Sequence, residues 1–171
     1  MTDVFKDTFS RKKAVEWDNE NPDLSLTLPS RYFFDPKIFD KEIDSIFFRS
    51  WHFVCHKSEV WNIGDFVKFD FLKESILVIR AKDGSVNAVH NVCKHRGTQL
   101  IQNRRGNIRD MIICPYHAWS YHLDGKLRHA PRSETMKNFK KNDWGLSRVC
   151  IEEFAGFYFI NFDKNASPLS Q

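Results

Sequence analysis

The sequence predicts a mainly β protein built from antiparallel strands, with one α-helix in front of them. After Trp51 the apolar residues recur with a period of two over several short runs, which is the pattern of half-buried strands. Asp83-Gly84 and Asp124-Gly125 are dipeptides typical of tight turns, and they lie between or just after such runs. Sixteen Phe and five Trp against only seven Gly indicate a core of aromatic residues that suit a pleated sheet.

Eight segments carry the strand pattern. They are HFVCH (52–56), DFVKFDF (65–71), SILVIRA (75–81), VNAVHNV (86–92), DMIIC (110–114), WSYHLD (119–124), SRVCIEEF (147–154) and GFYFINF (156–162). Because short strands separated by turns favour neighbouring antiparallel pairs, we expect an antiparallel sheet arrangement rather than a parallel one.

An amphipathic helix is expected before the strands. Asp35 stands at the N-cap position and Pro36 at the first helical position, so the helix is predicted from Pro36 to about Arg49. Its apolar residues recur at helical spacing, and we expect that stripe to be part of the core; they are Ile38, Phe39, Ile43, Ile46 and Phe47. Residues 1–27 are polar and aperiodic, which predicts an extended N-terminal arm.

The length and composition favour one globular domain, because 171 residues with 42% hydrophobic and 28% charged residues are ordinary for such a fold. No apolar run reaches the roughly 18 residues of a membrane helix, and the start MTDVFKDTFSRKK lacks a signal-peptide core. We therefore expect a cytoplasmic protein without a membrane partner. In that compartment cysteines stay reduced, and we expect Cys55 and Cys150 to be buried thiols.

Two further cysteines each have a histidine close by. Cys93-x-His95 is followed by eighteen residues and then by Cys114-x-x-His117, and both elements fall at the ends of predicted strands. Two Cys and two His satisfy the ligand count of a tetrahedral zinc site. A zinc finger, however, takes both cysteines from one element and both histidines from the other. One of each per loop favours a binuclear cluster in which each loop gives its Cys to one iron and its His to the other.

At this point a family resemblance can be named. CKHRG (93–97) and CPYHAWSY (114–121) closely resemble the two cluster loops of Rieske proteins, specifically the large subunits of Rieske non-haem iron oxygenases of the ring-hydroxylating type. Three further segments resemble their equivalents in those subunits: YFFDPKIFDKEIDSIFFRSWHFVCHKSEV (32–60), VNAVHNVCKHRGTQL (86–100) and GFYFINFD (156–163). The resemblance implies a Rieske-type β-sandwich over residues 28–165, with residues 166–171 starting a linker to a catalytic domain absent from this chain.

The resemblance also implies the cofactor and its ligands. Cys93 and Cys114 would hold the inner iron of one [2Fe-2S] cluster, and His95 and His117 the outer iron. Relatives pass single electrons from a reductase or ferredoxin through this cluster to a mononuclear Fe(II), held by two His and a carboxylate in the missing C-terminal domain of a homotrimer. The chain is thus expected to be part of an oxidoreductase, a mono- or dioxygenase, without being competent for oxygenation by itself.

Several residues depart from the respiratory-chain type of Rieske protein. That type has a disulfide and a Ser that hydrogen-bonds the cluster, whereas this sequence has Thr98, Tyr116 and Trp119 at the matching positions. Fewer hydrogen bonds to sulfur predict a reduction potential of the cluster at the low end of the Rieske range. Tyr121 matches a position whose hydroxyl bonds a ligand sulfur in the family. Ala118 replaces the commoner Gly, which costs about 1 kcal/mol if φ is positive there.

Other histidines and the basic residues of the chain allow further interpretations. His52 and His56 are four residues apart but lie in an alternating strand pattern without a carboxylate partner, so they are expected to be structural. The stretch between His90 and Arg132 holds eight Lys or Arg against two acids, so the alternative class is a zinc-stabilised β module that binds nucleic acid. No recognition helix accompanies these charges, so we expect no nucleic-acid partner. The run RRGNIRD (104–110) is expected to be a solvated hairpin tip, or else a docking patch for an acidic electron donor.

Overall fold

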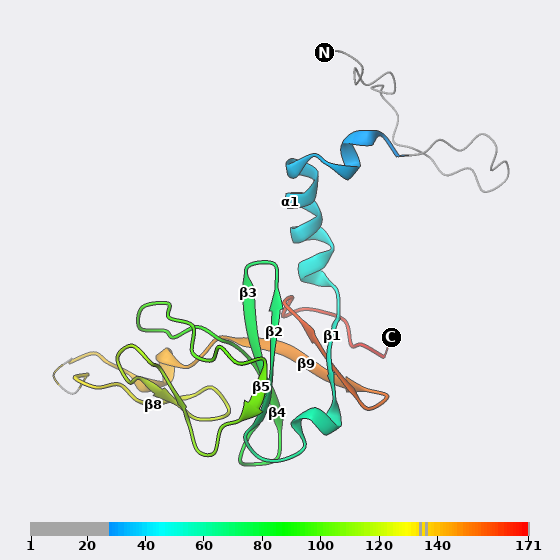
Figure 1. The fold of residues 1–171 in the computed structure, drawn as a ribbon. Helices are drawn as coiled ribbons and strands as arrows, with labels where there is room; N and C mark the ends of the chain where they lie inside the picture. The colour runs from blue at the N-terminus through cyan, green and yellow to red at the C-terminus, as the bar shows by residue number, and fades with distance from the viewer. Residues whose placement is uncertain (1–27, 134, 136, 171) are drawn as a thin grey trace. The chain divides into compact units, whose positions relative to one another are not determined.

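The computed structural model describes residues 28–133, 135 and 137–170, shown in Figure 1. The chain divides into two compact units, which separate between Phe48 and Arg49. The expected N-terminal arm, residues 1–27, lies outside the described residues. Within the part that is described, no helix is long and apolar enough to cross a membrane.

The first unit contains the predicted helix. After a short 3-10 turn η2 (Ser30–Phe33), α1 spans Pro36–Ser45, and the Asp35 side chain caps it by accepting a hydrogen bond of 2.9 Å from the Lys37 amide. The helix ends four residues before the predicted limit and gives way to a separate 3-10 turn, η3 (Phe47–Arg49). The prediction of a core stripe is wrong for the described structure, because no α1 side chain is buried.

The second unit is built on a seven-stranded antiparallel sheet with the order β1-β10-β9-β4-β3-β2-β5 (Figure 1). The strands are β1 (His52–His56), β2 (Asp65–Phe71), β3 (Glu74–Arg80), β4 (Val86–His90), β5 (Arg105–Asn107), β9 (Arg148–Phe154) and β10 (Phe157–Asn161). Two 3-10 turns, η4 (Lys57–Val60) and η5 (Lys141–Trp144), also belong to this unit. The expected mainly β, antiparallel fold is confirmed.

A smaller sheet carries part of the site. It has the order β6-β7-β8, with β6 (Ile112–Ile113), β7 (Ser120–Tyr121) and β8 (Leu127–His129). The turn between β7 and β8 contains Gly125 at φ +86°, and Gly84 between β3 and β4 has φ +85°, so both Asp-Gly turns use the left-handed conformation that glycine permits. The sequence pattern did not reveal β8, because three residues are too few to show alternation.

Strand β3 is buried on both faces, which explains its uninterrupted apolar run. Ile76 and Val78 belong to one buried cluster, whereas Leu77 and Ile79 belong to a second cluster that also includes Ile112 of the small sheet. Successive side chains of a strand point to opposite faces, so this one strand contributes to both cores. The second cluster contains the two cysteines of the Cys/His motifs and thereby joins the site to the main sheet.

The run RRGNIRD is not a hairpin tip. Arg105–Asn107 form the edge strand β5, in which Arg105 pairs with Val67 and Asn107 with Asp65. The Arg105 guanidinium also lies 2.7 Å from the Glu59 carboxylate. The prediction of a hairpin tip is wrong, because pairing along one edge of β2 is a long-range contact that the local pattern of charges and one glycine does not indicate. All three residues of β5 are exposed, so the expected solvation is confirmed, and the alternative of a docking patch stays a prediction.

Candidate functional site

The two Cys/His motifs lie on two loops of the second unit. Loop 1, residues 92–100, follows β4, and loop 2, residues 114–119, connects β6 to β7. The loops share one backbone pattern. In loop 1 the Cys93 amide donates to the Thr98 carbonyl at 2.8 Å, and in loop 2 the Cys114 amide donates to the Trp119 carbonyl at 2.8 Å. Each cysteine amide thus reaches the residue five positions later, so the loops curl in the same way.

The fourth residue after each cysteine closes the turn in a left-handed conformation. Gly97 has φ +70° and donates to the Cys93 carbonyl at 3.0 Å, while Ala118 has φ +56° and donates to the Cys114 carbonyl at 3.1 Å. Ala118 stands where a positive φ carries a cost, and the structure shows that its φ is positive. A left-handed alanine is strained by about 1 kcal/mol relative to glycine.

The two thiols meet inside the protein. Cys93 and Cys114 are 1% and 3% exposed, and both belong to the same buried cluster. The fully buried Tyr121 hydroxyl lies 3.2 Å from Cys93 Sγ and accepts a hydrogen bond of 3.1 Å from the Lys94 amide. Because that amide already donates to the Tyr121 oxygen, the tyrosine hydrogen is available to the sulfur.

Ionisation of the two thiols is set by opposing influences. Burial raises the pKa of Cys93, in spite of the Tyr121 hydroxyl that favours its thiolate. Burial also opposes ionisation of Cys114, but hydrogen bonds from the amides of His117 and Tyr116 lower the pKa of Cys114 below its ordinary value.

The two imidazoles lie beside each other on the outer side. His95 and His117 are partly exposed, and their ring centroids are 4.7 Å apart with planes at 70°. Each ring rests on an aromatic neighbour: His95 stacks on Trp119 with centroids 5.0 Å apart, and His117 lies 3.8 Å from the Tyr116 ring centroid. Aromatic packing of this kind restricts how the imidazoles can turn.

One nitrogen of each imidazole is buried without a partner. The Nδ1 atoms of His95 and His117 are inaccessible to solvent and find no hydrogen-bond partner among the described residues. A buried polar atom without a partner costs free energy, and native proteins seldom leave one unpaired. Two such nitrogens from two loops, next to two buried thiols, form the donor set of a cluster that takes sulfur on one side and imidazole on the other.

All four residues predicted for the site are therefore brought together, with the thiols inside and the imidazoles outside. Among the described His, Cys, Asp and Glu side chains, no three converge on a point suited to a single metal ion. The two imidazoles lie beside each other, and the two cysteines belong to one buried cluster. This donor set fits a [2Fe-2S] centre held by two Cys and two His.

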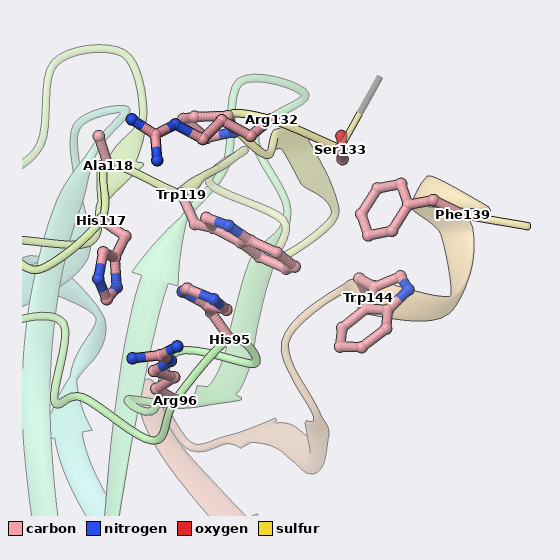
Figure 2. A pocket seen from close by; sticks show the side chains of 10 residues that line it. His95, Arg96, His117, Ala118, Trp119, Arg132, Ser133, Phe139 and Trp144 are labelled. Atoms are coloured by element: carbon pink, nitrogen blue, oxygen red, sulfur yellow. The ribbon is translucent and has the colours of Figure 1, made fainter. Parts of the chain in front are cut away.

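A pocket of about 660 Å³ opens beside the imidazoles (Figure 2). His95 and His117 line it together with Trp119, Phe139 and Trp144, whose rings pack against one another at centroid distances of 5.6–5.8 Å. From the sequence, Trp119 is only a departure from another type of Rieske protein, and this aromatic cluster is not predicted. Phe139 and Trp144 lie in a segment without helical or strand periodicity, and the only available signal was their aromatic character.

Positive charge lines the same pocket. Arg96 and Arg132 are exposed there (Figure 2). Burial lowers the pKa of His117, and the nearby His95, Arg96 and Arg132 lower it further because like charges disfavour the imidazolium. The lowered pKa of His117 favours the neutral form that a metal requires of an imidazole ligand.

The remaining cysteines and histidines have structural surroundings. Cys55 is fully buried as predicted, and burial raises the pKa of its thiol to about 12. Cys150 is only partly buried, which corrects the prediction; its thiol donates to the Asp163 carbonyl at 3.5 Å. His56 accepts from the Ser58 amide and caps η4, and His52 packs on the Phe71 ring at 4.3 Å.

Comparisons with known proteins agree with this site. The family model described as the Rieske [2Fe-2S] domain matches residues 50–140, a range that includes all four Cys and His residues. In the solved structure of a quaternary ammonium Rieske monooxygenase in complex with L-carnitine, the similar part superposes with a TM-score of 0.83 at 37% identity. It covers 88% of this chain and 42% of that one.

Two curated relatives show the same partial coverage. The carnitine monooxygenase oxygenase subunit of Escherichia coli strain K12 is 42% identical over 149 residues, which are 87% of this chain and 40% of the relative. The 2-aminobenzenesulfonate 2,3-dioxygenase subunit alpha of an Alcaligenes species is 37% identical over 165 residues, 95% of this chain and 42% of that protein. The chain spans about two fifths of the length of these relatives. With its paired Cys/His loops and antiparallel sheets, the chain belongs to the Rieske [2Fe-2S] domain family, in the form found in the large subunits of Rieske oxygenases.

Proposed function

We propose that this chain is the electron-transfer domain of a Rieske oxygenase large subunit and that Cys93, His95, Cys114 and His117 bind its [2Fe-2S] cluster. The observation that carries the proposal is the pair of buried, unpartnered Nδ1 atoms of the two histidines beside two buried thiols. When bound, such a cluster accepts and releases one electron at a time. Family membership supports the electron-transfer role.

The burial of the ligands supports an inner and an outer iron. Cys93 and Cys114 would hold the inner iron, because both cysteines are buried in the second core cluster, which includes Leu77, Ile79 and Ile112. His95 and His117 would hold the outer iron, because their rings reach the pocket. Two neutral imidazoles in place of two thiolates remove two negative charges, so reduction is easier than for an all-cysteine cluster.

Neighbouring side chains would tune and orient these ligands. The Tyr121 hydroxyl, 3.2 Å from Cys93 Sγ, stabilises negative charge on that sulfur and thereby favours the reduced state. Trp119 lies flat against His95 and keeps the buried Nδ1 of this ring away from water. The aromatic cluster of Trp119, Phe139 and Trp144 gives the pocket beside the imidazole pair an apolar wall.

The electron donor is proposed to be a reductase or ferredoxin with an acidic face. Arg96 and Arg132 support this assignment, because they place two positive charges at the pocket that the imidazoles line. Opposite charges on two proteins speed their encounter and orient them. The electrons are proposed to continue to a mononuclear iron in the catalytic domain of a large subunit that assembles as a homotrimer, as the resemblance to oxygenase large subunits implies.

The proposal is tested by cluster content. After anaerobic incubation with ferrous iron and sulfide, the protein should bind two irons and two sulfides, turn reddish brown and give an EPR signal once reduced. Cys93→Ser and Cys114→Ser should abolish the cluster, whereas the matched control Cys150→Ser, outside both loops, should retain it. A colourless protein that holds one zinc ion would contradict the proposal.

A further inference from the structure

Asn91 is a fully buried amide placed two residues before Cys93, directly after β4. Its Oδ1 accepts a hydrogen bond of 2.8 Å from the Ile101 amide, and its Nδ2 donates to the Ile101 carbonyl at 2.7 Å and to Ser75 Oγ at 3.2 Å. Its backbone N–H donates to the Ser75 carbonyl at 2.8 Å, and its carbonyl accepts from the Leu100 amide at 3.2 Å. Every polar atom of this residue is therefore satisfied.

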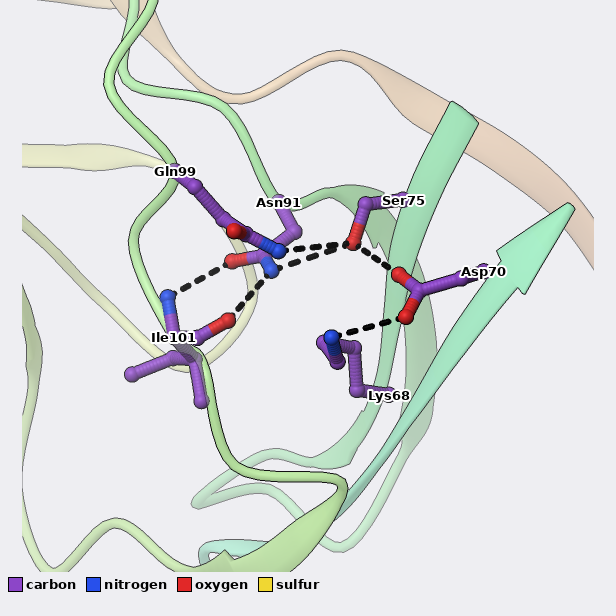
Figure 3. A network of polar contacts seen from close by, with 6 residues as sticks. All are labelled: Lys68, Asp70, Ser75, Asn91, Gln99 and Ile101. Carbon is purple, nitrogen blue, oxygen red and sulfur yellow. Dashed lines mark hydrogen bonds and ion pairs between the residues drawn. The ribbon is translucent and has the colours of Figure 1, made fainter. Parts of the chain in front are cut away.

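The bonds to Ile101 copy those of a strand. A peptide group in an antiparallel ladder donates to and accepts from the same opposite residue, and the Asn91 side chain does this with both backbone groups of Ile101 (Figure 3). Only one orientation of the amide satisfies both groups, because its oxygen must face the N–H and its nitrogen the carbonyl. The side chain thus joins the two ends of loop 1.

The two cluster loops differ in how their bases are closed. Loop 2 is closed by the β6–β7 ladder, in which Ile112 pairs with Tyr121 and Ile113 with Ser120. Loop 1 has one isolated bridge, between Val92 and Gln99, and no strand follows this bridge directly. Asn91 lies next to that bridge and supplies from its side chain the bonds that a continued ladder would supply from the backbone.

A polar network anchors this closure to the main sheet. Ser75 Oγ donates to Asp70 Oδ1 at 2.6 Å and accepts from Gln99 Nε2 at 3.4 Å, and the Lys68 ammonium lies 2.7 Å from the Asp70 carboxylate (Figure 3). Ser75 belongs to β3, whereas Lys68 and Asp70 belong to β2. The base of loop 1 is therefore bonded to the β2–β3 hairpin, whose strand β3 is buried on both faces.

We propose that Asn91 is a positioning residue for the metal centre: its amide closes the base of loop 1 and fixes where Cys93 and His95 stand relative to loop 2. The inference rests on the proposed function, because the ligands are those proposed above. A buried amide is stabilising only when its partners are present, and its removal leaves the Ile101 N–H and carbonyl without their bonds. Loop 1 then loses the closure that loop 2 keeps.

The test compares Asn91→Ala with the control Asn87→Ala in cluster-loaded protein. Asn87 is a buried asparagine of β4, the strand that Asn91 follows; it is 8% exposed, and its side-chain amide donates to Ser85 Oγ, away from both loops. Asn91→Ala should lose its cluster to a chelator about tenfold faster than the wild type. It should also broaden the EPR signal and speed hydrogen exchange in residues 92–101 but not in residues 114–119. Asn87→Ala should match the wild type in all three measurements.

A second variant keeps the test decisive if Asn91→Ala does not fold. Ser75→Ala removes the hydroxyl that accepts a hydrogen bond from Asn91 Nδ2 but leaves both bonds between Asn91 and Ile101. It should therefore accelerate cluster loss only a few-fold, with faster hydrogen exchange in residues 92–101. The inference would be overturned if Asn91→Ala matched the wild type in its rate of cluster loss, its EPR signal and its hydrogen exchange. If only Ser75→Ala folds, the same result for that variant would overturn it. If the wild type binds no cluster, the proposed function fails, and hydrogen exchange of the metal-free variants still decides the role of Asn91.

Discussion

The imidazole of His95 lies parallel to the indole of Trp119, with ring centroids 5.0 Å apart and planes within 4° of each other. The ring of His117 approaches the same imidazole edgewise at 4.7 Å. Between these two neighbours His95 has little freedom to turn, so its Nδ1 stays buried. An aromatic side chain thus preorganises a proposed metal ligand before any metal binds.

Replacing Trp119 should reduce stability strongly. Trp119→Ala removes a 7% exposed side chain that packs on His95, Phe139 and Trp144, and it should lower the free energy of unfolding by about 3–5 kcal/mol. Urea denaturation of the folded protein measures this change. Trp61→Ala serves as the control, because Trp61 is 65% exposed and its loss should change stability by less than about 0.5 kcal/mol. Equal stability of the two variants would contradict the packing role of Trp119.

Removing the Tyr121 hydroxyl should lower the reduction potential of the cluster. Tyr121→Phe deletes the donor 3.2 Å from Cys93 Sγ, so negative charge on the reduced centre is less well stabilised. The expected fall is on the order of 60 mV, which for a one-electron couple corresponds to a tenfold change in the equilibrium constant of reduction. A redox titration followed by EPR measures it. Tyr158→Phe removes the hydroxyl of another buried tyrosine, in β10, and should leave the potential unchanged.

The two left-handed loop positions should respond in opposite directions to exchange of glycine and alanine. Ala118→Gly relieves the strain at φ +56° and should raise the free energy of unfolding by up to about 1 kcal/mol. Gly97→Ala introduces a side chain into open space at φ +70° and should lower it by about 1 kcal/mol. Thermal unfolding of both variants measures the pair. Shifts of the same sign would show that the loops do not share one conformation.

The two cysteines outside the loops should differ in reactivity and in its pH dependence. Burial raises the pKa of Cys55 to about 12, so its thiol stays protonated up to that pH, and the neutral form does not react with iodoacetamide. At pH 8.5 the folded protein should be labelled at the partly exposed Cys150 and not at Cys55. Mass spectrometry of digested protein identifies the labelled site. Protein unfolded in guanidinium is the control and should be labelled at both positions.

Ionisation of Cys55 should also make the protein less stable in alkali. The unfolded thiol loses its proton near pH 9, whereas the folded thiol keeps it to about pH 12. The unfolded state therefore binds fewer protons above pH 9, and stability falls as the pH rises through this window. Cys55→Ala should remove this part of the pH dependence, as urea denaturation at pH 8 and pH 10.5 would show. An unchanged slope would assign the alkaline loss to other groups.

Charge reversal at the pocket should slow electron delivery. Arg96→Glu combined with Arg132→Glu should reduce the rate at which an acidic ferredoxin reduces the cluster by at least about tenfold at low salt. Stopped-flow absorbance measures the rate, and the difference from the wild type should shrink at high salt because screening weakens charge attraction. Lys73→Glu, in the turn between β2 and β3, is the control. Equal rates for the wild type and the double variant would place the donor elsewhere.

The sequence predicted the larger part of the fold because the information was local. All eight alternating segments overlap strands of the structure, and the Asp35 cap and both Asp-Gly turns form as expected. The prediction failed where pairing is non-local or too short for a period to show. The basic residues around Arg105 form the edge strand β5, which pairs with β2, and Leu127–His129 form β8.

The candidate site divides in the same way. The spacing of Cys93, His95, Cys114 and His117 was sufficient to predict these four residues as the proposed cluster ligands, because loop ligation requires those residue types close together in sequence. Only the tertiary structure decided that the thiols lie inside and the imidazoles at a pocket, that Trp119 stacks on His95, and that the Asn91 amide closes loop 1. These relationships join residues that are distant in sequence or share no periodic pattern, and packing and hydrogen bonding of the whole chain bring them together.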